Sequence, residues 1–170
     1  MSRFETTFLA FNRWLLILIL AAMSVIIFAN VGLRYLTNQS IQWAEEVARH
    51  LMIWITFIGC GPVLRYGGHI AIDNLQDALP RSAAVALRAV IALLMLGFCA
   101  CVVYFGLEYM DRTQYQRTPA TQISFAFIYA ALPLGMALTT IHWLLIVRGY
   151  ILERRFAADS HFDATASASL

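Results

Sequence analysis

Residues 14–33 read WLLILILAAMSVIIFANVGL, twenty consecutive positions without a charged side chain. A bilayer core about 30 Å thick is crossed by about 20 such residues, because an α-helix rises about 1.5 Å per residue. Arg13 precedes the stretch and Arg34 follows it. The stretch is too long for the apolar part of a signal peptide, and no small-x-small cleavage motif closes it. We therefore interpret it as a retained membrane span.

Three later segments approach the same length, which indicates four spans in all. Pro62 lies near the far end of the second and Pro133 lies inside the fourth, where each is expected to kink or interrupt a helix. We predict an all-α integral membrane protein whose four-helix membrane domain covers residues 1–156. The predicted transmembrane helices occupy about residues 14–35, 41–64, 86–110 and 122–147.

The composition agrees with a membrane protein. Of the 170 residues, 61% are hydrophobic and only 13% are charged, whereas soluble domains are about 45–50% apolar and about 25% charged. A soluble chain of this length has too little interior to bury the excess. The net charge of +2 is too small to indicate nucleic-acid binding. The three cysteines all lie in apolar runs and predict neither a disulfide framework nor a metal site.

The loop at residues 65–82 and the C-terminal tail differ from the spans in character. Ile72, Leu75 and Leu79 follow helical spacing with polar residues between them, which predicts a short amphipathic helix on the cytoplasmic membrane surface. Residues 157–170 are rich in Ala, Ser and Asp, a composition that predicts a disordered cytoplasmic tail.

The orientation follows from the arginines, because cytoplasmic loops are enriched in basic residues. We predict that both termini and the 65–82 loop face the cytoplasm, and that the loops near residues 38 and 115 face outward. The cytoplasmic set is Arg3, Arg13, Arg65, Arg81, Arg88, Arg148, Arg154 and Arg155, against Arg34, Arg112 and Arg117 on the other side.

One dense cluster of ionisable residues opens the second span: Glu45, Glu46, Arg49 and His50. On a helix, Glu45 reaches Arg49 and Glu46 reaches His50, both at i,i+4 with the acid first. Ionisable groups at membrane depth are costly and usually functional. Two interpretations stay open, that the cluster fixes the packing of the helices or that it docks a partner protein. Trp43 beside it suits an anchor at the membrane interface.

The middle of the predicted bilayer carries no permanent charge. Its main polar side chains are Ser24, Asn30, Thr56, Thr139 and Thr140. A proton-coupled pump would be expected to place an acid there. The chain is therefore predicted not to transport a solute by itself.

Two other function classes find little support. A haem held by two histidines needs both at one depth, but His50 and His142 differ by roughly 15–20 Å along parallel helices. A membrane anchor for a redox or haem complex is nevertheless the alternative function. No zinc-ligand spacing, phosphate-binding glycine loop or nucleophile motif appears in the sequence, so the chain is predicted not to be an enzyme.

Residues 34–46, RYLTNQSIQWAEE, are followed by Arg49, by Phe57-Ile58-Gly59 and by residues 65–69, RYGGH. In this order and spacing, the stretch from about residue 30 to 80 resembles the small membrane subunit, or DctQ-like Q subunit, of tripartite ATP-independent periplasmic (TRAP) transporters. The resemblance implies a scaffold in the bacterial inner membrane for a large multi-span subunit that carries solute and sodium. It also implies a periplasmic solute-binding protein as partner, and no cofactor in this subunit.

The resemblance also suggests roles for individual residues. It implies that Glu45, Glu46 and Arg49, with His50, hold the helices together or meet the large subunit. Arg65, Gly68 and His69 match a cytoplasmic loop motif of the family. The resemblance also implies a docking surface on the periplasmic side. The candidates for it are the residues predicted on that side: Arg34, Asn38, Arg112 and Arg117.

Overall fold

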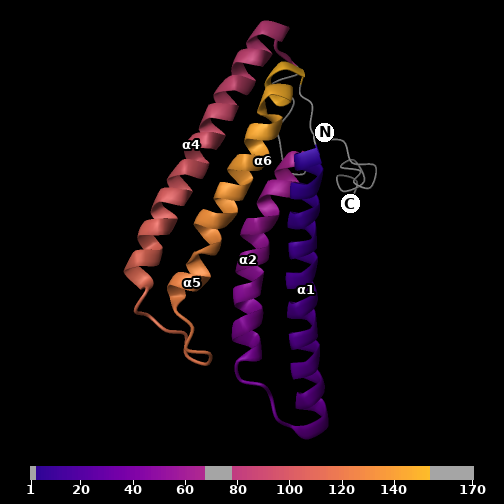
Figure 1. The fold of residues 1–170 in the computed structure, drawn as a ribbon, viewed down its shortest axis with the longest axis vertical. Coiled ribbons are helices and arrows are strands. Elements are labelled where there is room, and N and C mark those ends of the chain that lie inside the picture. The colour runs from indigo at the N-terminus through magenta and orange to yellow at the C-terminus, as the bar shows by residue number, and fades with distance from the viewer. Residues whose placement is uncertain (1–2, 68–77, 154–170) are drawn as a thin grey trace.

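The computed structural model describes residues 3–67 and 78–153. Four helices in this part of the chain are long and apolar enough to cross a membrane, which confirms the predicted all-α, four-span class. The predicted surface helix falls almost wholly outside the described residues, as does the predicted disordered tail. The helices are α1 (Arg3–Thr37), α2 (Ala44–Arg65), α4 (Arg81–Thr113), α5 (Phe125–Tyr129) and α6 (Ala131–Glu153) (Figure 1).

The first and third spans are longer than hydropathy predicted. α1 has 35 residues and α4 has 33, so each measures about 50 Å, well beyond a bilayer core of about 30 Å. Hydropathy marks only the part of a helix that lies in lipid, whereas backbone hydrogen bonding continues into the headgroup layer. α2 has 22 residues, about 33 Å, and matches the core closely.

The fourth span consists of α5 and α6, and the break between them follows from Pro133. Proline has no N–H, and its ring crowds the carbonyl four residues earlier, which here belongs to Tyr129, the last residue of α5. Ser124 caps the N-terminus of α5, where its side chain accepts a hydrogen bond from the backbone N–H of Ala126 at 3.3 Å. The interruption predicted at Pro133 is therefore confirmed.

The helices form a single layer in the order α1, α2, α6, α4, with α6 packed between α2 and α4 (Figure 1). A buried apolar cluster joins α2, α4 and α6. It consists of Leu64, Ala92, Trp143, Ile146 and Tyr150. α2 and α6 approach closely where Gly135 faces the backbone of Phe57. The outward faces of α1 and α4 carry exposed large apolar side chains, as expected for surfaces that lie against lipid or another membrane protein.

Candidate functional site

The Glu46 carboxylate binds the loop that joins α4 to α5. One of its oxygens accepts a hydrogen bond from the backbone N–H of Ala120 at 2.9 Å. The other accepts from the backbone N–H of Thr121 at 3.0 Å and from the Thr121 hydroxyl. Glu46 is buried, and hydrogen bonds to an ionised acceptor are among the strong ones. Glu46 therefore fixes the loop against the first turn of α2.

The loop has a compact structure of its own. Its two ends meet in an isolated antiparallel bridge between Arg117 and Ser124, and the Thr118 N–H donates to the Ile123 carbonyl at 2.9 Å. Thr118 is buried, and its hydroxyl hydrogen-bonds that of Thr121 at 2.8 Å. The segment is therefore an ordered platform at one end of the bundle.

This arrangement corrects the local pairs expected along α2. Within residues 3–67 and 78–153, no ion pair involves Glu45, Glu46, Arg49 or His50. Glu46 turns toward the loop, 74 and 75 residues further along the chain, because the loop amides lie at the same end of the bundle. Glu45 and Arg49 are exposed on α2, whereas His50 is half-buried. Spacing along a helix identifies the residues that could pair one turn apart, but tertiary packing determines the direction in which each side chain points.

A second buried polar contact closes the opposite end of α2. Arg65 was expected to open a loop, but it is the last residue of α2 and is fully buried. Its Nη2 donates to Oε2 of Glu5, near the start of α1, at 2.6 Å. The pair therefore joins the N-terminal end of α1 to the C-terminal end of α2. Gly68 and His69, the other members of the predicted loop motif, lie outside the described residues.

His142 joins three helices within the membrane. Its ring is fully buried, packs on Gly61 of α2, and lies 4.7 Å from the Phe8 ring of α1. Its Nε2 is 3.2 Å from the Asn12 side-chain nitrogen, also on α1. His142 therefore links α6 to α1 through the Asn12 contact and to α2 through packing on Gly61.

Sequence reasoning did not single out Asn12. The available signal was its position, since Glu5, Phe8 and Asn12 are spaced i, i+3 and i+7 and therefore share one face of α1. His142 packs on Gly61, eleven residues beyond His50 on α2, so the two histidines lie about 16 Å apart along that helix. This separation gives no support to a haem held between them.

The four predicted docking residues lie near the turns at the Glu46 end. Arg34, Asn38, Arg112 and Arg117 are all exposed. Arg112 pairs with Glu108 at 2.5 Å along α4, and Arg117 donates to the Gln122 carbonyl at 3.4 Å. Asn38 has a φ of 55°, a left-handed conformation that asparagine tolerates better than most residues. The structure thus gathers these side chains at one end of the molecule.

Hydroxyls in the middle of the spans are satisfied within their own helices. Thr56, Thr139 and Thr140 donate to the carbonyls of the residues four positions earlier, at 2.8, 2.9 and 2.8 Å. Asn30 was expected in this layer, but its Oδ1 accepts from the backbone N–H of Ile41 at 2.6 Å and so fixes the α1–α2 connection. These bonds leave the threonine hydroxyls engaged in local contacts rather than directed at a solute.

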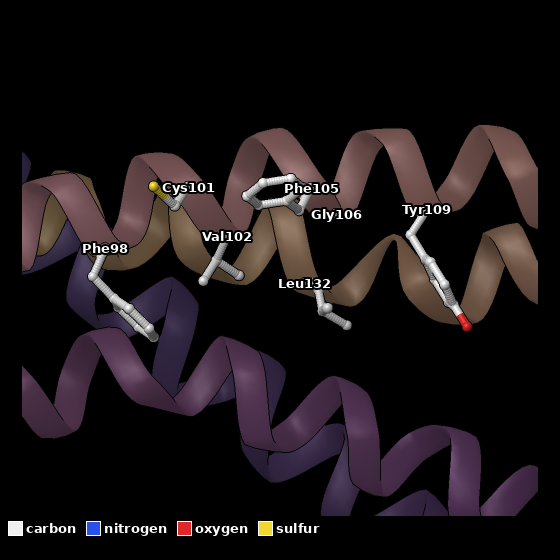
Figure 2. Close-up of a pocket in the computed structure, with 7 residues that line it drawn as sticks. All are labelled: Phe98, Cys101, Val102, Phe105, Gly106, Tyr109 and Leu132. Carbon is white, nitrogen blue, oxygen red and sulfur yellow. The ribbon is translucent and has the colours of Figure 1, made fainter.

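An open apolar groove follows α4. It has a volume of about 360 Å³ and is lined by Phe98, Cys101, Val102, Phe105, Gly106 and Tyr109 from α4 and by Leu132 from α6 (Figure 2). Gly106 lies against Pro133, where an added Cβ would approach the proline ring to 3.0 Å. The lining has little polar character, so it suits acyl chains or an apolar helix.

Comparison with known proteins agrees with this architecture. The profile of the family described as "Tripartite ATP-independent periplasmic transporters, DctQ component" matches residues 23–150. The chain is 34% identical, over 145 residues, to the ectoine TRAP transporter small permease protein TeaB of Halomonas elongata. This alignment covers 84% of this chain and 72% of TeaB. It is 25% identical, over 117 residues, to the sialic acid TRAP transporter small permease protein SiaQ of Vibrio cholerae. This second alignment covers 69% of this chain and 68% of SiaQ.

A third relative is a much longer protein. The isethionate TRAP transporter permease protein DctMQ of Oleidesulfovibrio alaskensis is 24% identical over 152 residues, which cover 88% of this chain but only 24% of that protein. The family profile covers most of the chain, and its four spans match the predicted architecture. The chain therefore belongs to the DctQ family and is a small permease subunit of a TRAP transporter.

Proposed function

We propose that this subunit is a non-catalytic scaffold for a large sodium-coupled carrier subunit in the bacterial inner membrane. The observation that supports the proposal is where the charges lie. The acidic residues in the described ranges all lie near helix ends: Glu5, Glu45, Glu46, Glu108, Asp111 and Glu153. A carrier that coupled ions to solute by itself would be expected to hold ionisable groups near the bilayer midplane.

The relatives support the choice of partner. In the DctMQ permease of O. alaskensis, the part similar to this chain is about a quarter of a longer permease. We infer that this chain meets the equivalent larger portion as a separate subunit, through packing and interhelical hydrogen bonds in the membrane. The sodium site belongs to that larger subunit in this proposal.

The test of the scaffold is co-purification. The affinity-tagged full chain, extracted in mild detergent from the membranes of its own source, is expected to bring down one large multi-span permease in near-stoichiometric amount. Mass spectrometry identifies it, and an untagged strain gives the background. Recovery of the chain alone, or with haem or a redox enzyme, would favour the membrane-anchor alternative.

The proposal has a second part, a docking surface for a periplasmic solute-binding protein. Arg34, Arg112 and Arg117 are exposed at the end of the bundle that we assign to the periplasm from the arginine distribution. Asn38 lies in the α1–α2 connection, directly after the end of α1. Exposed basic groups speed and orient the encounter with an acidic surface more than they tighten the complex.

Charge reversal tests this docking surface. The double variant Arg34→Glu/Arg117→Glu is expected to lower the association rate of the binding protein with the nanodisc-embedded transporter by about tenfold at low salt, with a smaller effect at high salt. Surface plasmon resonance measures both rates. Arg148→Glu, an exposed arginine at the opposite end of the bundle, is the matched control. Equal rates and salt dependence in all three proteins would exclude the docking surface.

A further inference from the structure

A second pocket lies between the first turns of α2, the α4–α5 loop and α5. It has a volume of about 180 Å³, smaller than the 300 Å³ or so at which pockets begin to enclose whole small-molecule ligands. Arg49 and His50 line it on one side, and Ile53, Phe125 and Ile128 supply apolar walls. The pocket therefore combines a basic rim with an apolar floor, and its size suits one chemical group of a larger molecule.

Arg49 is the arginine of this pocket, and its charge is not neutralised by an ion pair within the described residues. The Arg49 side chain is exposed, and no carboxylate of residues 3–67 or 78–153 pairs with it. Glu46 also lines the pocket, but both of its oxygens are already bonded to the loop. The guanidinium is thus available to an external acceptor, and its fork of N–H donors matches the oxygens of a phosphate.

The depth of Arg49 indicates the source of that phosphate. Arg49 lies five residues after Ala44, the first residue of α2, or about 7 Å along a helix whose length matches the bilayer core. A long arginine side chain at this depth extends toward the headgroup boundary while its stem stays in the apolar layer. Phospholipid phosphates occupy that boundary, and the apolar walls of the pocket continue toward the acyl region.

The geometry points to a phospholipid site, in which Arg49 holds the phosphate of a glycerophospholipid and Ile53, Phe125 and Ile128 contact the upper part of its acyl chains. His50 borders the headgroup, and the ordered α4–α5 loop closes the pocket on its other side. The Glu46 bonds keep that loop in place, so they shape the site without contacting the lipid. This inference does not depend on the scaffold proposal, because the site lies within one chain.

Native mass spectrometry of the full chain in detergent tests the site. Phosphatidylglycerol is expected to bind more tightly than diacylglycerol with the same acyl chains. Arg49→Gln is expected to weaken phosphatidylglycerol binding about fivefold, the effect of removing one basic group near a membrane surface, and to leave diacylglycerol binding unchanged. Arg49→Lys is expected to retain most of the affinity. Arg112→Gln, at an exposed arginine that pairs with Glu108 outside the pocket, is the matched control and is expected to bind like the parent.

Three outcomes would overturn the site. The first is phosphatidylglycerol binding by Arg49→Gln at the parent affinity. The second is binding of soluble glycerol 3-phosphate as tight as that of the lipid, since the pocket would then recognise free phosphate. The third is a variant that keeps its lipid preference but loses the large subunit in co-purification, which would assign Arg49 to a protein carboxylate instead.

Discussion

Gly135→Ala is expected to force α2 and α6 apart and to lower the free energy of unfolding by about 2–3 kcal/mol, the cost typical of overpacking a close contact. A Cβ at this position would lie 2.6 Å from the carbonyl carbon, the oxygen and the Cβ of Phe57. Two of these are backbone atoms, which cannot rotate away as the end of a flexible side chain can. Unfolding in mixed micelles, followed by the fluorescence of Trp54 and Trp143, measures the loss.

Gly97→Ala is the matched control. An added Cβ at Gly97 meets nothing within 4 Å, so this variant is expected to stay within about 0.5 kcal/mol of the parent or to gain slightly from helix propensity. The comparison separates a steric effect from a general effect of glycine in a helix. Equal stabilities for the two variants would contradict the close approach of α2 and α6.

Glu46→Ala is expected to release the α4–α5 loop. The variant removes the acceptor of three hydrogen bonds from Ala120 and Thr121 and leaves the two amides without a protein partner. The amides of both residues are expected to lose hydrogen-exchange protection by about tenfold or more, because local opening would then need no charge-assisted bond to break. Exchange of the full chain in nanodiscs, read by mass spectrometry of peptides from residues 114–124, measures this change.

Glu45→Ala provides the comparison for Glu46→Ala, since it removes the same charge from the adjacent, exposed position. It is expected to leave protection of residues 114–124 unchanged. Equal exchange in the two variants would show that overall charge, rather than the specific bonds of Glu46, orders the loop. If Glu46→Ala also reduces co-purification with the large subunit, loop disorder is a sufficient cause, so exposed Glu45 is the more direct probe of an interface.

The spans were predictable because lipid imposes a simple rule of length and apolarity. Pro133 was predictable as a break for an equally local reason, its missing N–H. The family resemblance rested on about residues 30–80, and the comparison confirms it over a longer stretch, 23–150. Each of these features depends on residues that are close in sequence.

The polar contacts of the candidate site were not predictable in the same way. Glu46 was assigned to His50, its neighbour one turn along the helix, but it bonds a loop in the second half of the chain. Arg65 was placed in a loop, but it is buried against Glu5. In both cases the partner depends on how each helix is rotated about its axis, and packing against the other helices determines that rotation.

The contact between Asn12 and His142 has a consequence for biosynthesis. The two residues are 130 positions apart, in the first and the last span. At about 5–20 residues per second, the ribosome needs roughly 7 to 26 seconds to make the intervening chain. During that interval the Asn12 amide lacks its final partner, and a polar group without a partner is costly to bury. The newly made protein therefore forms this polar contact only after the last helix has been made, so α1 and α6 can take their final arrangement only at the end of synthesis.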